Sequence, residues 1–155
     1  MKVLILYYSK SGHTLEAANA TAEGIRLAGS EVDIVAVNNF EVSMLTDYDG
    51  IIIGSPCWAG SITSSGVAKP IVRVINSLPE NRLKGKRCGG ISVYAKKGGQ
   101  TTVKHLGELM AQKGCEDYKP GPSAKAGVPM SLWKGPSVGT EDKANFKAFG
   151  IEFVA

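Results

Sequence analysis

Residues 9–14 have the types and spacing of a phosphate-binding loop. Ser9, Ser11 and Thr14 supply three hydroxyls, and Gly12 lets the backbone approach an anion closely. An apolar run precedes them and an amphipathic segment follows, so their amides lie at a helix N-terminus, where unpaired N–H groups and the helix dipole attract phosphate. A polar turn that only caps a helix has the same composition, and both interpretations stay open at this point.

The same loop differs from the common nucleotide motifs. It lacks the G-x-x-x-x-G-K-S/T of nucleoside triphosphate sites, and no G-x-G-x-x-G begins the helix that follows. A monophosphate is therefore the phosphate ligand that fits the loop best.

The elements that must position this loop alternate along the chain. Continuous apolar runs predict strands, and apolar residues three and four positions apart predict helices. The predicted strands are 2–8, 32–37, 50–54, 86–94 and a weak fifth strand at 115–119. The predicted helices are 14–28, a short stretch within 38–49, one that starts near Gly66 with Pro70 in its first turn, one around 103–110 that Gly114 ends, and one that starts near Thr140. The proline-rich residues 120–139 are expected to be irregular.

Strands that alternate with helices predict an α/β fold, here a single domain over residues 1–155. Its parallel sheet should carry helices on both faces, joined by right-handed crossovers. Ligands of such sheets bind beyond the carboxyl ends of the strands, where the strand order reverses. The loops after the first, third and fourth strands, 9–14, 55–60 and 95–100, are therefore the expected site.

Taken together, the three loops resemble those of the flavodoxin family. The matching segments are Ser9-Lys-Ser-Gly-His-Thr14, Gly54-Ser-Pro-Cys-Trp-Ala-Gly60 and Gly98-Gly-Gln100. The resemblance implies a flavodoxin-like three-layer sandwich, with a five-stranded parallel sheet in the order 2-1-3-4-5 and FMN bound at the strand ends. The residues that it places around FMN are Ser9, Lys10, Ser11, Gly12, His13, Thr14, Ser55, Pro56, Cys57, Trp58, Ala59, Gly60, Tyr94, Ala95, Lys96, Gly98 and Gly99.

The resemblance also implies roles for some of these residues. The first loop holds the FMN phosphate with its hydroxyls and amides. The His13 side chain is expected to be solvated in preference to the alternative, a direct contact with the phosphate. Trp58 stacks on the flavin ring, and Gly60 is the candidate for turning a carbonyl toward flavin N5. Ala59 departs from the family, in which glycine often follows the aromatic residue directly. Tyr94 or Trp133 covers the second flavin face, unless Trp133 only anchors its own segment.

Other chemistries lack the residues that they need. The strands that end at Tyr8 and Gly54 lack the acidic residues of a response regulator. A phosphatase-type C-x5-R would require arginine where Thr63 stands, so Cys57 is expected to pack or to contact backbone. The two histidines have no partner at metal-ligand spacing, so no metal is expected and His105 is interpreted as a helix-surface residue.

Composition limits location and partners. The chain has 155 residues, with 18 Lys plus Arg and 14 Asp plus Glu, so its formal charge is +4. This charge is dispersed rather than clustered, so no nucleic acid partner is expected. Three cysteines without C-x-x-C spacing indicate reduced thiols, and no apolar run is long enough to span a membrane. A cytoplasmic location follows as the expectation.

The leading functional hypothesis is an electron carrier, in which FMN shuttles electrons between redox partner proteins. The alternative is an FMN-dependent NAD(P)H:quinone oxidoreductase, so whether the chain is an enzyme stays open. A third hypothesis is a module that keeps the fold and has lost its cofactor. The chain's shortness favours the carrier, as a monomer or weak homo-oligomer. Flavodoxins are typically acidic, so a charge of +4 predicts acidic partners, and Lys96 and Lys97 are expected to stabilise the anionic reduced flavin.

Overall fold

The computed structural model describes residues 1–57, 66–95, 98–126 and 137–155. Five parallel strands form one sheet in the order β2-β1-β3-β4-β5, which is the predicted order. The strands are β1 (Lys2–Tyr7), β2 (Glu31–Ala36), β3 (Gly50–Pro56), β4 (Arg87–Tyr94) and β5 (Asp117–Lys125). The helices are α1 (His13–Leu27), α2 (Lys69–Ser77), α3 (Gly99–Ala111) and α4 (Thr140–Phe153), with short 3-10 helices η1 (Val37–Asn39) and η2 (Val42–Asp47) between β2 and β3.

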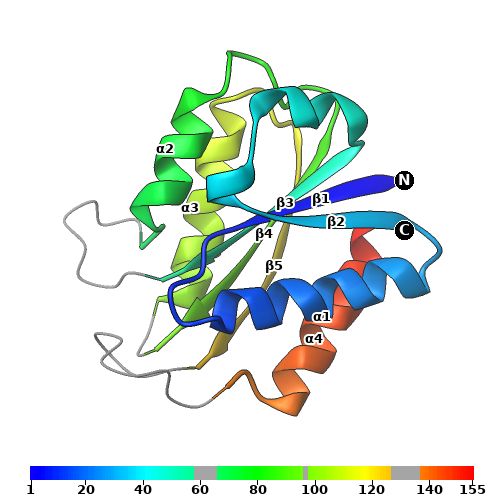
Figure 1. Cartoon of the computed structure of the whole chain (residues 1–155), viewed down its shortest axis with the longest axis vertical. Coiled ribbons are helices and arrows are strands. Elements are labelled where there is room, and N and C mark those ends of the chain that lie inside the picture. The colour runs from blue at the N-terminus through cyan, green and yellow to red at the C-terminus, as the bar shows by residue number, and fades with distance from the viewer. Residues whose placement is uncertain (58–65, 96–97, 127–136) are drawn as a thin grey trace.

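Helices cover both faces of the sheet, as the alternation of elements predicts. Figure 1 shows α1 and α4 on one face and α2 and α3 on the other. The strand β1, which is paired on both sides, contributes Val3 and Ile5 to the core under α1 and α4, and Leu4 and Leu6 to the core under α2 and α3. Both of its faces are buried, which is why its sequence is apolar without alternation.

Two glycines let α1 and α4 approach each other closely. A Cβ atom at Gly24 would overlap the carbonyl group of Lys147, and one at Gly150 would overlap the carbonyl oxygen of Thr21. The core beneath this contact is filled by three phenylalanines of α4, namely Phe146, Phe149 and Phe153. The contact holds the two helices side by side, with α1 beginning at the expected phosphate loop.

The fifth strand is longer than predicted. It continues through Pro120 and Pro122 to Lys125, so the expectation of an irregular segment from residue 120 is wrong for residues 120–125. β5 is an edge strand that pairs with β4 alone. Proline removes a backbone donor, but an edge strand has backbone groups that face away from the sheet and need no partner within it. The pairing also shifts register between Gly90 and Ser92, opposite these prolines.

The second α-helix starts later than predicted, at Lys69 rather than near Gly66. Val67 instead forms an isolated antiparallel bridge with Cys57, and the amide of Ala68 donates to the Ser55 hydroxyl over 3.0 Å. These contacts hold residues 67–68 extended against the end of β3. Pro70 then falls within the first turn of α2, as predicted.

Candidate functional site

The strand ends that lead into the three predicted loops meet at the carboxyl edge of the sheet. The amide of Tyr8 donates to the carbonyl of Gly54 over 3.2 Å, which joins the ends of β1 and β3. The amide of Cys57 donates to the carbonyl of Val93 over 2.9 Å, which joins the ends of β3 and β4. The site therefore lies where the order of strands reverses, as the topology predicts.

The first loop is preorganised around Gly12. This residue has φ 93° and is the N-cap of α1, and its amide donates to the Ser9 hydroxyl over 2.9 Å. Among the described residues no side chain caps the helix, so the first-turn amides of α1 retain their capacity for an outside acceptor. A loop with positive φ at glycine and uncapped amides at a helix N-terminus fits a phosphate group.

Other side chains of this loop differ in exposure. Thr14 is buried, and its methyl group lies against Gly54, where a Cβ atom would come within 3.2 Å of it. Ser11 is partly exposed, and Lys10 is exposed. Glycine in β3 thus makes room for Thr14 at the start of α1.

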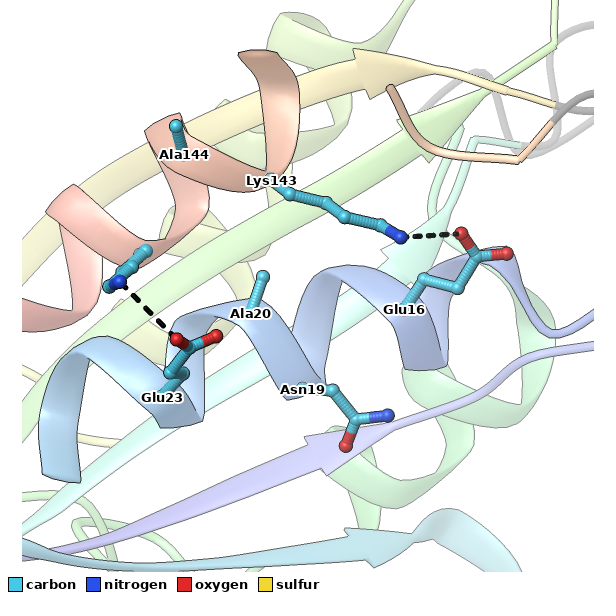
Figure 2. Close-up of a pocket in the computed structure, with 7 residues that line it drawn as sticks. Glu16, Asn19, Ala20, Glu23, Lys143 and Ala144 are labelled. Atoms are coloured by element: carbon cyan, nitrogen blue, oxygen red, sulfur yellow. Dashed lines mark ion pairs between the residues drawn. The ribbon is translucent and has the colours of Figure 1, made fainter. Parts of the chain in front are cut away.

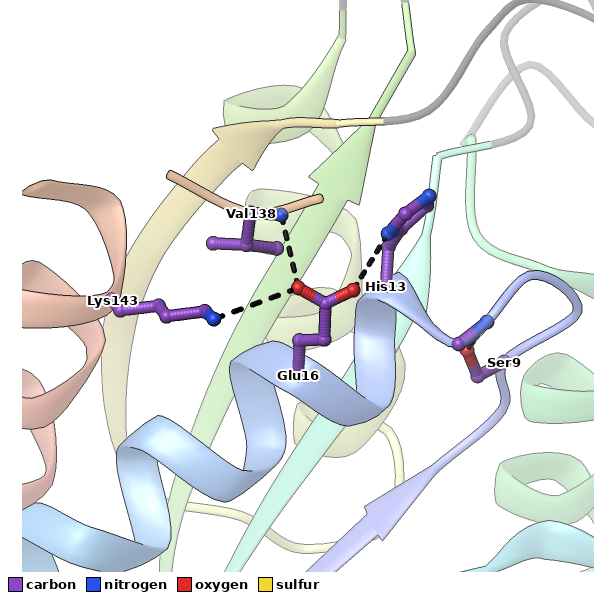
Figure 3. Close-up of polar contacts among 6 residues, drawn as sticks. Ser9, His13, Glu16, Val138 and Lys143 are labelled. Atoms are coloured by element: carbon purple, nitrogen blue, oxygen red, sulfur yellow. Dashed lines mark hydrogen bonds and ion pairs between the residues drawn. The ribbon is translucent and has the colours of Figure 1, made fainter. Parts of the chain in front are cut away.

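His13 is buried rather than solvated, so the expectation for this side chain is wrong. It is 3% exposed, and its Nδ1 lies 2.9 Å from the Glu16 carboxylate. The other oxygen of that carboxylate accepts the amide of Val138 over 3.0 Å, and Lys143 of α4 lies 3.9 Å away. Figure 3 shows these groups converging on Glu16 at the start of α1. Val138, just before α4, therefore reaches the carboxylate that contacts the imidazole.

Cys57 connects the second and third loops by packing and by a backbone contact, which confirms its expected role. Gly66 and Gly98 both have positive φ, and Cβ atoms there would lie 3.1 Å and 2.8 Å from the Cys57 sulfur. Gly98 is the N-cap of α3, and its carbonyl accepts the hydroxyl of Thr102 over 3.1 Å. The two glycines let both loops close around one thiol.

Two neighbouring serines lie at the ends of β3 and β4 and differ in their partners. Ser55 and Ser92 are opposite each other in the register and fully buried. The Ser55 hydroxyl donates to the Pro56 carbonyl over 2.7 Å and accepts from Ala68. Within the described residues, Ser92 Oγ is the one buried side-chain nitrogen or oxygen without a hydrogen-bond partner. The end of β4 therefore holds an unsatisfied hydroxyl.

Several predicted site residues lie outside the described residues. They are Trp58, Ala59, Gly60, Lys96, Lys97 and Trp133. Of the remaining residues, Tyr94 and Ala95 are partly exposed, and Tyr94 lies against Gly99 at the start of α3. Stacking on the flavin, rotation of Gly60, and coverage of its second face all remain predictions.

A groove between α1 and α4 has a different character. Figure 2 shows Glu16, Glu23 and Lys143 among the residues that line it. Ion pairs cross it between Glu23 and Lys147 at 3.3 Å and between Glu16 and Lys143 at 3.9 Å. The negative charges on α1 are thus paired with positive charges on α4, and these ion pairs link the two helices. The loops therefore remain the candidate site.

Metal and thiol chemistry gain no support from the described part of the chain. It contains no group of three or more histidine, cysteine or acidic residues that could hold a metal ion. His105 lies on the surface of α3, as predicted, and its Nδ1 lies 2.9 Å from the Glu108 carboxylate. Burial raises the pKa of the Cys88 thiol, which therefore stays protonated and unreactive.

A search for membrane-spanning helices gives a negative result. No helix in the described ranges is both long enough and apolar enough to cross a bilayer.

Comparison with known families decides what this arrangement belongs to. The flavodoxin family model matches residues 5–128, which include the first loop, the ends of β3 and β4, and most of the sheet. The chain belongs to the flavodoxin family. FMN is the cofactor of this family, and the fold is the one that the flavodoxin resemblance predicts.

Solved flavodoxins share the fold over nearly the whole chain. An archaeal flavodoxin superposes with a TM-score of 0.77 at 20% identity, covering 99% of this chain and 96% of its own. Oxidised flavodoxin 1 from Bacillus cereus superposes with a TM-score of 0.75 at 23% identity, covering 99% of this chain and 97% of its own. At these identities the likeness establishes the fold.

Curated relatives have another name. A protein of Rhodopseudomonas palustris named NAD(P)H dehydrogenase (quinone) is 36% identical over 123 residues, which are 66% of this chain and 61% of that protein. A Chromohalobacter salexigens protein of the same name is 35% identical over 85 residues, which are 41% of this chain and 42% of its own length. The chain therefore spans about two-fifths to three-fifths of these relatives.

Sequence reasoning missed two residues that shape the first loop. Glu16 holds His13, and Val138 reaches Glu16 from 122 positions away. The spacing of three between His13 and Glu16 is a signal for a contact on one helix face. No local pattern pointed to Val138.

Proposed function

We propose that this protein binds FMN across its three loops and carries electrons between redox partner proteins. The observation that carries the proposal is the first loop, where Gly12 at φ 93° opens α1 without a side-chain cap. The loop lies beside the ends of β3 and β4 in a member of the flavodoxin family. A phosphate at that helix end would anchor FMN with its ring toward the second and third loops.

The residues around the cofactor would hold and orient it rather than supply acids or bases. The amides of the first turn of α1, with the hydroxyls of Ser11 and Thr14, would bind the phosphate. Ser9 would keep the loop closed through its bond to the Gly12 amide. FMN supplies the one- and two-electron chemistry when it is bound. The backbone near Gly98 and Gly99 would face the flavin edge.

An NAD(P)H:quinone oxidoreductase is the second candidate. It is favoured by the curated relatives of that name, at 35% and 36% identity. The carrier is favoured by the solved flavodoxins, 96% and 97% of whose chains match this one. The two candidates share the cofactor and differ in whether a nicotinamide and a quinone react directly at the flavin.

The visible spectrum of the purified protein tests FMN binding first. We expect a yellow protein, and heat release of FMN rather than FAD or riboflavin. A protein that is colourless, and remains so after incubation with FMN, would contradict both candidates. Steady-state oxidation of NADH and NADPH with a soluble quinone then separates them. A carrier should show negligible turnover and accumulate a one-electron reduced flavin on stepwise reduction, whereas rapid turnover would establish the enzyme.

Acidic redox partners are the expected partners of a carrier with a formal charge of +4. Such partners dock transiently through small surfaces, and their association rates fall as salt screens the attraction. Electron transfer to an acidic partner should slow with increasing ionic strength; an increase would indicate a basic partner. A reducing, cytoplasmic compartment suits the chain because its three cysteines, all within the described ranges, form no disulfide.

A further inference from the structure

Glu16 joins three segments that are distant in sequence. Its Oε1 lies 2.9 Å from His13 Nδ1, and its Oε2 accepts the Val138 amide over 3.0 Å. Lys143 of α4 adds a positive charge at 3.9 Å. Figure 3 shows the carboxylate between these groups at the first turn of α1. The amide and the ammonium hold the carboxylate in place, and the carboxylate holds the imidazole.

This contact constrains the tautomer and the orientation of the His13 ring. A carboxylate only accepts hydrogen bonds, so His13 Nδ1 must carry the proton that lies between them. The ring is 3% exposed and the Glu16 side chain 20% exposed, so little water competes for the bond. The tautomer and the orientation of the ring are thus specified together.

The backbone of His13 belongs to the phosphate loop. His13 is the first residue of α1 and follows Gly12, so its backbone sets the direction of the neighbouring first-turn amides. Its φ and ψ cannot change without moving a buried ring that Glu16 holds. A donor that is already fixed in place binds an anion without a further cost in conformational entropy.

Glu23 provides a natural comparison. It lies two turns further along the same face of α1 and pairs with Lys147 of α4 at 3.3 Å, as Glu16 pairs with Lys143. Figure 2 shows both pairs across the same groove. Among the described contacts, only Glu16 also binds an imidazole and a backbone amide.

We propose that Glu16 is a positioning residue for the FMN phosphate, acting through His13. The inference rests on the proposed binding of FMN and adds a residue that does not itself touch the cofactor. Its electrostatic sign makes it testable. Removing a carboxylate near an anion site should, by Coulomb attraction and repulsion alone, strengthen phosphate binding. A fall in FMN affinity on removing Glu16 therefore reports lost positioning.

The experiment compares FMN with riboflavin, which lacks the phosphate. Dissociation constants are measured by flavin fluorescence quenching with apoprotein of the wild type, Glu16→Ala and Glu23→Ala. We expect Glu16→Ala to weaken FMN binding by about tenfold, the size of one hydrogen bond to a charged group, and to change riboflavin binding by less than about twofold. Glu23→Ala should change neither by more than about twofold.

A double-mutant cycle tests the route through His13. In a His13→Ala background, Glu16→Ala should change FMN binding by less than about twofold. Nitrogen-15 NMR of the apoprotein should show the imidazole protonated at Nδ1 in the wild type and not uniquely so in Glu16→Ala. If Glu16→Ala does not fold, Glu16→Gln carries the same test, since its amide oxygen can still accept the Val138 amide.

Four results would overturn the inference: equal factors for FMN and riboflavin, FMN affinity that rises, FMN affinity that stays within twofold, or a full effect of Glu16→Ala without His13. Failure of the proposed function looks different. Wild-type apoprotein would then bind neither flavin, or would bind riboflavin as tightly as FMN, and the inference would fall with it.

Discussion

The contact between α1 and α4 and the carboxyl edge of the sheet both depend on glycine, but for different physical reasons. Between the helices, Gly24 and Gly150 have ordinary helical backbones and are needed because the facing carbonyl groups leave no room for a Cβ. At the edge, Gly12 and Gly98 are needed for φ values of 93° and 97° at the starts of α1 and α3. The first pair serves packing, and the second shapes a binding site.

This difference separates stability from binding. A change at the helix contact should lower the free energy of unfolding and leave the FMN affinity of the folded protein intact. A change at the edge should cost less stability and more affinity.

Gly24→Ala should lower the free energy of unfolding by about 3 kcal/mol, because the new methyl group meets the Lys147 backbone, which cannot move aside as a flexible side chain could. Urea denaturation of the apoprotein measures this loss. Gly139→Ala is the control, since among the described residues a Cβ there comes no closer than 3.8 Å to another group; because Gly139 is the N-cap of α4, where alanine is unfavourable, the variant should lose no more than about 1 kcal/mol. Equal losses in both variants would refute the packing role.

Gly98→Ala should lower the free energy of unfolding by about 2 kcal/mol, from left-handed strain and from a Cβ placed 2.8 Å from the Cys57 sulfur. FMN affinity of the folded protein should fall as well. Gly85→Ala isolates the strain, because Gly85 has φ +82° and no atom of the described part of the chain lies within 4 Å of the added atom. This variant should lose about 1 kcal/mol of unfolding free energy and keep its FMN affinity. A loss of affinity similar to that of Gly98→Ala would show that the carboxyl edge has no special role in binding.

Tyr118 supplies a pH test of packing on the other sheet face, where its ring fills space left by Gly90 and Gly107 and its hydroxyl donates to the Val103 carbonyl. Burial raises its pKa, because the phenolate is poorly solvated there. The stability linked to it is complete below the unfolded pKa of about 10 and is lost as pH rises toward the folded pKa.

Between pH 9 and 11, the wild type should therefore lose about 1.4 kcal/mol more of its unfolding free energy than Tyr118→Phe does. Urea midpoints at the two pH values give this difference. Cys88 and Tyr48, whose pKa values are also raised, contribute equally to both proteins. Parallel losses would show that the Tyr118 hydroxyl ionises freely in the folded state.

Ser55→Ala and Ser92→Ala should change stability by about 1 kcal/mol each, in opposite directions. Ser55 loses two hydrogen bonds, one to the Pro56 carbonyl and one from the Ala68 amide, and the second holds residues 67–68 against β3. Ser92 loses a buried hydroxyl that has no partner within the described residues, which removes a desolvation cost. Thermal unfolding of both apoproteins is the measurement. If Ser92→Ala also destabilises, its hydroxyl has a bound water or another partner.

Prediction from sequence succeeded where one local signal decided the outcome. The apolar run of β1, the amphipathic residues of α1 and the glycine at position 12 lie within short windows, and the structure has each of them where the pattern indicates. Prediction failed for β5, because Pro120 and Pro122 are turn signals locally and become acceptable only at a sheet edge. It failed for the start of α2 because a hydroxyl in β3 captures the amide of Ala68.

By itself, the sequence determined the order of strands and helices, the loop that begins α1, and the family to which both belong, because these depend on residues close together along the chain. Only the tertiary structure decided that His13 is buried. Its ring contacts Glu16, which in turn accepts the amide of Val138, 122 positions beyond Glu16, and no local pattern encodes which distant amide will reach a carboxylate. Contacts of that kind depend on how two helices pack side by side on one face of the folded sheet. Here they converge on the loop that would hold the cofactor's phosphate.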